Sequence, residues 1–228
     1  MSLLSHTIYP VGDTAITLQW GEEISEEAQR CVLQAFHLIR EALLPGVTDL
    51  VPAYHSLMVV YDTLHDYARR CAALEKVILQ AKDIPKVTAR YVEIPVCYDP
   101  SLGPDVEGLA REKGLGPETL IRIHSAPWYT VYMIGFLPGF PYMGSVSPEI
   151  ATPRKSEPAR CVPRGSVGIA GRQTGIYPLD SPGGWHIIGR TPLRLFEPAA
   201  ADPVFLRPGD QVKFVPISLD LYHERASR

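Results

Sequence analysis

Two neighbouring stretches, GFLPGFPYMG (Gly135–Gly144) and PRKSEPARCVPRGSVGIAGRQTGIYPLDSPGGWHIIGR (Pro153–Arg190), decide the fold of this chain. Together with the residues between them they hold 10 of the 18 glycines and 8 of the 22 prolines. Neither a helix nor a long strand accommodates that density. Aromatic and branched residues run through the segment, which a flexible linker would lack. It therefore predicts short strands joined by tightly specified turns that present backbone NH groups to a ligand.

The chain around this segment continues the same pattern. Strand-like runs after Pro127 cover residues 129–135, 161–162, 166–170, 175–177, 185–189, 193–196 and 211–216. Several short strands bounded by Gly and Pro are typical of a closed or nearly closed β-barrel. We predict this barrel over residues 127–218, followed by a loosely held tail at 219–228.

The first part of the chain favours a different architecture. Strand-like pieces at 6–10 and 14–20 precede an amphipathic helix over 25–44, for which Ser25 is the expected N-cap. A strand pair at 47–53 and 56–61, a helix over 66–81 and a strand over 86–98 follow. This order predicts an α+β domain of the split βαβ kind over residues 1–98. A two-helix connector is expected over 99–126.

Composition and length narrow the class of protein. With 228 residues, of which 46% are hydrophobic, the chain can bury one large core or two modest ones. No apolar run reaches the roughly 18 residues that a membrane span needs, and the N-terminus does not resemble a signal peptide. We therefore expect no membrane association and a cytoplasmic location. The four cysteines form no CxxC and the seven histidines no HExxH, so neither a disulfide framework nor a structural metal is expected.

The distribution of charge points to the same central segment. The net charge of −3 gives no reason to expect nucleic-acid binding. Residues 135–190 carry six Lys or Arg against three acids, a local charge of +3, so the remainder carries −6. A positive, turn-rich segment suits a small anionic ligand, although an ordinary solvated surface explains the charge equally well.

Four arginines in this segment are candidate carboxylate ligands, because a guanidinium can hold a carboxylate through two parallel hydrogen bonds. They are Arg154, Arg164, Arg172 and Arg190. The alternative is that each is solvated or pairs with Glu149, Glu157 or Asp180. For the group as a whole, at least one ligand-binding arginine is favoured.

Polar turn residues add further candidates. Gln173 and Thr174 lie between two glycines, and Ser181-Pro182-Gly183-Gly184 precedes Trp185-His186. These groups favour an oxyanion- or amide-binding pocket, with strand capping as the alternative. Among them His186 alone can exchange a proton near neutral pH, although a structural histidine fits equally well.

Several familiar catalytic and nucleotide-binding patterns are absent. Ser166, His186 and Asp180 are the residue types of a nucleophile triad, but without a GxSxG elbow we do not favour one. The glycines at 165, 168 and 171 are not a GxGxxG fingerprint, and the chain has no GxxxxGK[ST] loop. If the system uses ATP, another chain is expected to hold it.

The aromatic residues of GFLPGFPYMG form a further pattern. Phe136, Phe140 and Tyr142 alternate with Gly and Pro. We predict that they form the wall of a pocket rather than a docking surface for another protein.

Long irregular strings in the chain resemble one protein family. GFLPGFPYMG, PRKSEPARCVPRGSVGIAGRQTGIYP and SPGGWHIIGRTPLRLFEP are similar to the KipI family, also known as the B subunits of 5-oxoprolinase (PxpB) and related to subunit 1 of allophanate hydrolase. GDTAITLQWG, PGVTDLVPAYHSLMVVYD and PGDQVKFVPI also match. The resemblance thus covers nearly the whole chain.

The resemblance implies an α+β N-terminal domain followed by a cyclophilin-like β-barrel C-terminal domain. It implies the B subunit of an ATP-dependent 5-oxoprolinase that cleaves 5-oxoproline to glutamate together with two partners, one PxpC-like or KipA-like and one PxpA-like. This chain alone then binds no cofactor, and ATP is held by a partner. Two alternatives remain within the family: a KipI-type inhibitor of a sensor histidine kinase, and a carboxyltransferase-like component of a urea or allophanate amidolyase system.

Pattern and resemblance together give one set of substrate-binding candidates. The set comprises Arg154, Arg164, Ser166, Gln173, Thr174, Tyr177, Gly183, Gly184, Trp185, His186 and Arg190. Relatives can carry Gln at the position of His186, so a hydrogen bond to substrate is the better interpretation there than general-base catalysis. His186 is accordingly a weak catalytic candidate.

Overall fold

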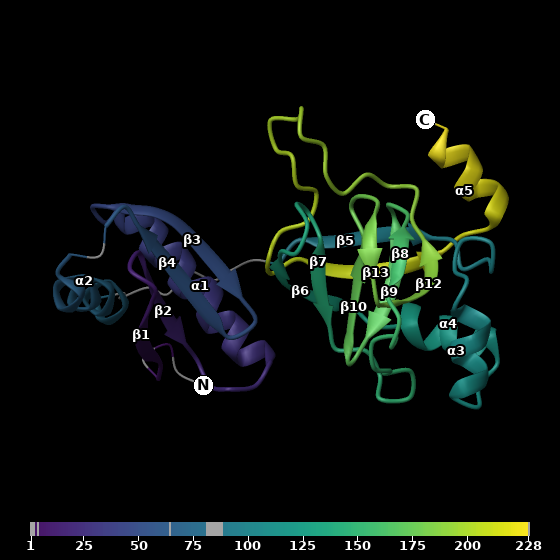
Figure 1. The fold of residues 1–228 in the computed structure, drawn as a ribbon, viewed down its shortest axis with the longest axis horizontal. Coiled ribbons are helices and arrows are strands. Elements are labelled where there is room, and N and C mark those ends of the chain that lie inside the picture. Colours follow the sequence, from purple (N-terminus) through teal and green to yellow (C-terminus); the bar gives the residue numbers. More distant parts are fainter. Residues whose placement is uncertain (1–2, 4, 64, 81–88, 228) are drawn as a thin grey trace. The chain divides into compact units, whose positions relative to one another are not determined.

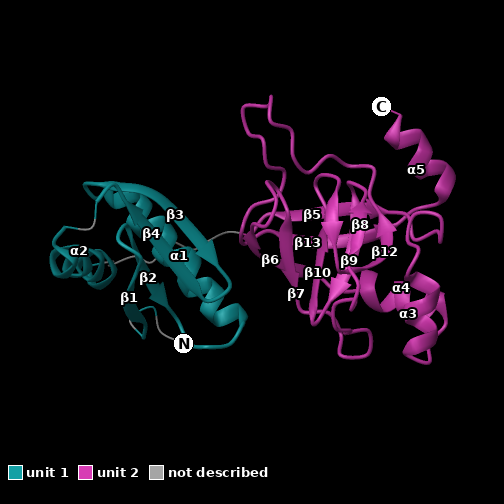
Figure 2. Ribbon diagram, in the orientation of Figure 1, with its two compact units in different colours: residues 1–88 teal, residues 89–228 magenta. Residues whose placement is uncertain are grey.

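The computed structural model describes residues 3, 5–63, 65–80 and 89–227. It divides into two compact units, residues 1–88 and 89–228, shown in different colours in Figure 2. Among the described residues, no helix combines the length and apolar character needed to cross a membrane.

The first unit is a four-stranded antiparallel sheet with two helices. The strands are ordered β1 (Thr7–Val11), β2 (Ala15–Gln19), β4 (Ser56–Tyr61) and β3 (Val47–Ala53). The helices α1 (Glu26–Ala42) and α2 (Tyr67–Leu79) pack against one another and share a buried cluster with β2 and β4. Up to the second helix, the elements follow the expected order.

Local signals set the ends of α1. The Ser25 side chain accepts a hydrogen bond from the Ala28 backbone NH at 3.1 Å, as expected of an N-cap. Glu26 and Glu27 lie in the first turn, where the helix dipole favours acids. The helix ends two residues before the expected position, because Leu43 adopts a left-handed conformation.

The expected strand at 86–98 belongs to the second unit, so its assignment to the first domain was wrong. The described strand β5 (Tyr91–Val96) pairs in parallel with β13 (Gln211–Pro216), and residues 86–88 lie outside the described part. Ile94 and Val96 are buried in the core of the second unit. The boundary between the units therefore precedes β5.

The second unit is built on a seven-stranded sheet (Figure 1). Its order is β12 (His186–Arg190), β9 (Ser166–Ala170), β10 (Gln173–Ile176), β7 (Pro141–Gly144), β6 (Tyr129–Ile134), β13 and β5. Just beyond β5, Cys97 and Arg190 exchange two backbone hydrogen bonds of 2.9 Å. This contact joins the two edges and nearly closes the sheet into the expected barrel.

Smaller elements surround the barrel. The connector helices are α3 (Val106–Glu112) and α4 (Pro117–Ser125), and a separate two-stranded ribbon contains β8 (Ala159–Val162) and β11 (Ser181–Gly183). The strands β7 and β11 were not predicted. Residues 193–196 form no strand, and only Phe196 makes an isolated bridge, to Val204. The expected loose tail contains the helix α5 (Leu219–Ala226), capped by Ser218.

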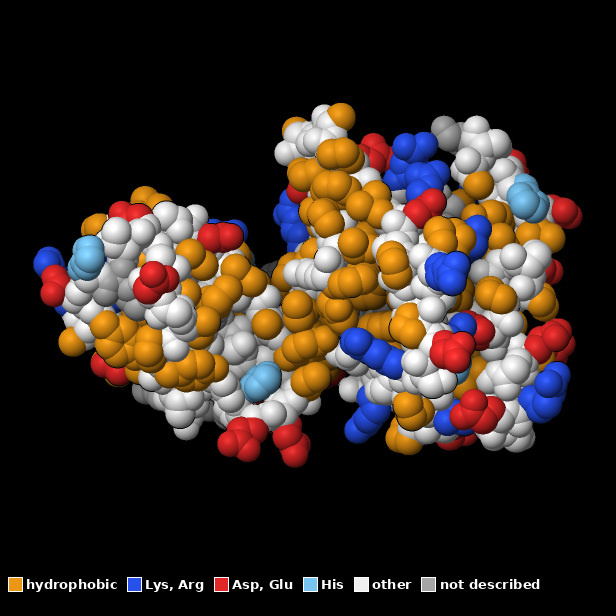
Figure 3. Space-filling model, viewed as in Figure 1, with side chains coloured by type: hydrophobic (Ala, Val, Ile, Leu, Met, Phe, Trp, Pro, Cys, Tyr) orange, Lys and Arg blue, Asp and Glu red, His pale blue; other side chains and the backbone are white. Residues whose placement is uncertain are grey.

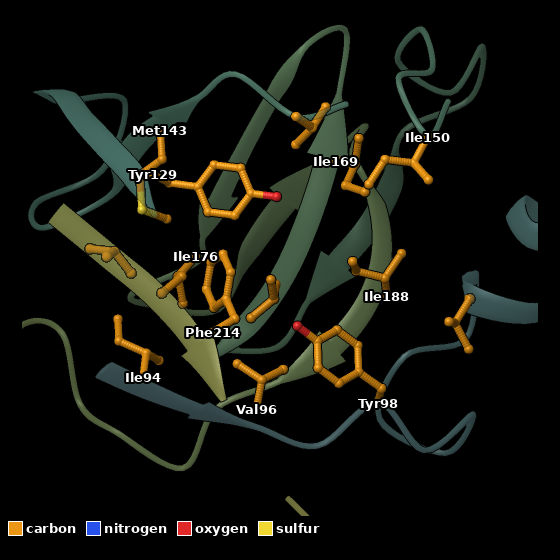
Figure 4. Packing of buried hydrophobic residues seen from close by; sticks show 14 of the residues in the cluster. Ile94, Val96, Tyr98, Tyr129, Met143, Ile150, Ile169, Ile176, Ile188 and Phe214 are labelled. Atoms are coloured by element: carbon orange, nitrogen blue, oxygen red, sulfur yellow. The ribbon is translucent and has the colours of Figure 1, made fainter. Parts of the chain in front are cut away.

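The interior of the barrel contains one buried polar chain among the apolar side chains seen in Figure 4. His124 of α4 is fully buried, with Nε2 2.9 Å from Thr174 Oγ1 and Nδ1 2.9 Å from the Tyr98 hydroxyl. The Thr174 hydroxyl donates to the Gly168 carbonyl at 3.0 Å. Thr174 therefore accepts from His124 Nε2–H, and Nδ1 accepts from Tyr98. The ring also stacks on Phe214 at 4.6 Å.

Burial makes the protonated form of His124 costly and lowers its pKa from 6.5 to about 3. Its nearest titratable neighbours, Tyr98 and Tyr129, both have raised pKa values and stay neutral in the same range. Below pH 6.5 the unfolded chain binds a proton at this position and the folded chain does not. Stability is thus fully present above pH 6.5 and is lost as the pH falls towards 3.

We expect His124 to lower the free energy of unfolding by about 1.4 kcal/mol between pH 7.5 and pH 5.5. Denaturant melts at the two pH values, compared with the non-titrating His124→Gln variant, isolate this contribution. The variant is expected to be less stable at pH 7.5 yet less sensitive to acid. Equal pH dependence in the two proteins would contradict the buried neutral histidine.

Candidate functional site

The outer face of the barrel sheet supports a second, smaller apolar cluster. Along β9, Val167 and Ile169 point into the barrel core, whereas Ala170 belongs to the outer cluster. Val162 of the β8–β11 ribbon packs in the same outer cluster. The ribbon therefore covers part of the outer face of the barrel.

A pocket of about 310 Å³ lies beside this outer cluster. It is lined by Phe136, Phe140, Tyr142, Arg154, Pro158, Tyr177, Pro182, Gly183, Gly184 and Trp185. We call it the aromatic pocket. Hydrophobic side chains are also gathered on the surface over β6, β7 and β10 (Figure 3).

The wall of the aromatic pocket is organised around Phe140. Its ring lies edge-to-face with Tyr177 at 5.1 Å and with Trp185 at 5.4 Å, and its centroid is 4.8 Å from that of Tyr142. Such offset and edge-on contacts are the favoured arrangements of aromatic rings. The wall is therefore formed before any ligand arrives.

Burial raises the pKa values of the two phenols in this wall, Tyr142 and Tyr177, above their ordinary value. The positive charge of Arg154, which lines the same pocket, acts on both pKa values in the opposite direction. Both phenols are protonated at neutral pH and able to donate a hydrogen bond.

Arg154 is exposed and lines the aromatic pocket. In the described part of the chain no carboxylate forms an ion pair with it. The neighbouring Lys155 differs, since its Nζ lies 2.6 Å from Asp105 Oδ2. Arg154 is thus a cation without an internal counter-ion at the rim of an apolar hollow, which suits an anionic ligand.

The segment that carries Arg154 is held from two sides. The Lys155 backbone NH donates to the Gly184 carbonyl at 2.8 Å. Asp105, just before α3, binds the Lys155 ammonium and also accepts from the Ile187 backbone NH at 2.6 Å. The connector helices therefore help to position the rim of the pocket.

A second pocket of about 470 Å³ shares Arg154 with the first. It contains His186 and Lys155 but also Glu112 and Glu157. Because both signs of charge are present, it is the weaker candidate for an anion.

The structure brings five of the predicted substrate ligands to the aromatic pocket: Arg154, Tyr177, Gly183, Gly184 and Trp185. His186 lines the second pocket instead. Gln173 is half-buried on β10, where it pairs with Ala170 and Gly144. The expected pocket wall of Phe136, Phe140 and Tyr142 is present.

The remaining candidates lie elsewhere. Thr174 is fully buried, and its hydroxyl is engaged inside the barrel. Ser166 and Arg190 face each other across β9 and β12, and Ser166 Oγ and Arg190 Nε are buried without a hydrogen-bond partner among the described atoms. The Arg164 side chain is exposed, and its backbone NH donates to Asp180 Oδ1 at 2.7 Å.

Ser166, His186 and Asp180 do not form a catalytic triad, in line with the absence of a GxSxG motif from the sequence. Asp180 is engaged by the Arg164 backbone, and Ser166 Oγ is buried without a hydrogen-bond partner among the described atoms. Within the described ranges, no group of three or more His, Cys, Asp or Glu side chains could hold a metal ion.

Sequence reasoning missed Asp105 and Pro158. Asp105 has no motif around it and acts only because the fold brings it to Lys155 and Ile187. Pro158 lines the pocket from a segment that approaches Gly184 only in the tertiary structure. No local signal would have found them.

Comparison with known proteins gives a consistent set of relatives. The family model for the carboxyltransferase domain, subdomain C and D, matches residues 6–206. The B subunits of 5-oxoprolinase from Bacillus subtilis (strain 168) and Escherichia coli O157:H7 are 44% and 37% identical over 96% and 91% of this chain. The matches cover 95% and 94% of those proteins.

A solved structure, that of TTHA0988, is similar with a TM-score of 0.79 and 41% identity over 90% of this chain. This chain spans only 40% of the length of that protein.

The two pocket glycines are expected to differ in their tolerance of a side chain. A Cβ at Gly183 would lie 2.3 Å from the Tyr177 hydroxyl oxygen, whereas the nearest neighbours of a Cβ at Gly184 are 3.8 Å away. Since overpacking typically costs about 1–3 kcal/mol, Gly183→Ala should lower the free energy of unfolding by that amount. Gly184→Ala, the matched control, should change it by less than about 0.5 kcal/mol. Equal denaturant melts for the two variants would contradict this geometry.

Proposed function

This chain belongs to the family of 5-oxoprolinase B subunits, PxpB, and from that membership we propose that it serves as the B subunit of an ATP-dependent enzyme that cleaves 5-oxoproline to glutamate. The observation that ties the proposal to a site is the aromatic pocket with Arg154 at its rim, a cation that pairs with no carboxylate of the described residues. The proposal includes PxpA-like and PxpC-like partners. ATP is held by one of them, because this sequence has neither a GxGxxG fingerprint nor a GxxxxGK[ST] loop.

The chemistry of 5-oxoproline suits the aromatic pocket. Its five-membered lactam is nearly flat, so its faces can pack on the wall around Phe140. Its carboxylate can accept two parallel hydrogen bonds from Arg154. The protonated hydroxyls of Tyr142 and Tyr177 can donate to the lactam carbonyl. These groups bind and orient the substrate, and we assign the phosphoryl transfer to the partner that holds ATP.

The same proposal extends to the finer description of the fold. The nearly closed barrel of the second unit is assigned as a cyclophilin-like C-terminal domain, and the first unit as a separate α+β domain. Prolyl isomerase activity does not follow from this assignment, because a fold does not determine function.

A carboxyltransferase-like component acting on urea or a similar amide is the second candidate. The description of the matching family model favours it. This function would require a biotin-bearing partner, whereas the first requires ATP and 5-oxoproline. Supplying urea and a biotinylated partner in parallel assays separates the two.

Reconstitution tests the proposed function directly. The chain is mixed with the PxpA and PxpC proteins of a related 5-oxoprolinase, and glutamate formation from 5-oxoproline and ATP is measured. We expect turnover only when all three proteins are present. An inactive mixture, with the same PxpA and PxpC preparations active beside their own PxpB, would show that the assignment is wrong.

In the reconstituted enzyme, Arg154→Ala is expected to raise the KM for 5-oxoproline roughly 10- to 100-fold. A hydrogen bond to a charged group is worth about 1.5–3 kcal/mol, and each 1.4 kcal/mol is a factor of ten. Arg160→Ala is the matched control, because Arg160 is an exposed arginine of the neighbouring β8 that does not line the pocket. A KM unchanged by Arg154→Ala would exclude this arginine as the carboxylate ligand.

A further inference from the structure

Phe136 has a backbone conformation that bulky residues rarely adopt. It lies just after β6, and its φ of 66° is in the left-handed region. The Leu137 backbone NH donates to the Gly135 carbonyl at 2.8 Å, which makes Phe136 the central residue of a three-residue turn. A γ-turn with positive φ at its centre is rare and strained.

The surrounding loop keeps Phe136 in this conformation. The Gly135 NH donates to the Phe140 carbonyl at 3.1 Å, and the Phe140 NH donates to the Leu137 carbonyl at 3.0 Å. Gly139 has a φ of 82° and lies directly against Leu195 and Phe196. The strained residue is therefore held by hydrogen bonds and packing on both sides.

Burial of the Phe136 ring does not offset this backbone strain. The side chain is 63% exposed although it is apolar, and among the described residues its ring meets that of Phe140 edge-on, at 5.8 Å and 87°. Yet Phe136 lines the aromatic pocket together with the rings buried behind it. Strained residues of this kind are found at ligand clamps, where a bound molecule supplies the missing contact.

We propose that Phe136 is a preformed clamp that packs on the exposed face of a flat ring bound in the aromatic pocket, and that it thereby selects small cyclic carboxylates. The inner face of such a ring meets the wall around Phe140, and Arg154 holds the carboxylate at the rim. A ring with a bulky substituent on its outer face would collide with Phe136. The identity of the ring as 5-oxoproline rests on the proposed function.

The clamp is tested with Phe136→Ala and Phe136→Gly in the reconstituted complex. Both variants lose the ring, so we expect both to raise the KM for 5-oxoproline about 10-fold with little change in kcat. Glycine tolerates the positive φ and alanine does not, so the glycine variant should melt about 2–4 °C above the alanine variant. Phe205→Ala removes another exposed phenylalanine outside this pocket and should leave KM unchanged.

The outcomes separate this inference from the proposed function. If the wild-type complex turns over 5-oxoproline and both Phe136 variants keep its KM, the clamp is wrong and the function stands. If the variants no longer assemble with the partner proteins, Phe136 is a docking residue and the clamp is equally wrong. If the wild-type complex has no such activity, calorimetric titration with 5-oxoproline, cyclopentanecarboxylate and benzoate decides. Binding of one of them, weakened about 10-fold by Phe136→Ala, supports the clamp, and no binding to the wild type overturns it.

Discussion

The hydrogen-bonded chain through His124 is the constraint on which the second unit depends. It links the segment after β5, a connector helix, β10 and β9 through Tyr98, His124, Thr174 and Gly168. The donor and acceptor roles in this series of hydrogen bonds are fixed. Because the single hydroxyl proton of Thr174 is donated to the Gly168 carbonyl, Thr174 must accept from His124, and His124 must accept from Tyr98. Loss of any member leaves a buried polar atom without a partner, which costs about 1–3 kcal/mol. The inside of the barrel thus specifies how these strands lie.

The arrangement of the strands in the barrel core also positions the aromatic pocket, because the same strands contribute to both. Residues that alternate along β9 face the barrel core on one side and the outer cluster on the other. Tyr177, which follows β10, forms part of the pocket wall. The ion pair between Lys155 and Asp105 then ties the rim segment to the connector. The pocket wall and its rim are consequently held by contacts within the protein itself.

The aromatic pocket is suited to binding and orienting a ligand rather than to carrying out a reaction by itself. The pocket offers a ligand an aromatic wall, two protonated phenols and Arg154, which pairs with no carboxylate among the described residues. The three residues considered for a catalytic triad do not come together. The strained turn at Phe136 fits the same role, since a fixed ring costs little entropy when a ligand packs on it.

The sequence by itself determined the secondary structure of the first unit, the barrel, the family and the aromatic wall. Helix caps and apolar periodicity act over a few residues, so Ser25 and the motif around Phe140 could be interpreted directly. Only the tertiary structure decided that β5 pairs with β13, that the Thr174 hydroxyl is used inside the barrel, and that, among the described residues, a carboxylate meets Lys155 but not Arg154. These outcomes depend on partners far away in the chain and on which face of a strand a residue occupies, and a local pattern contains neither.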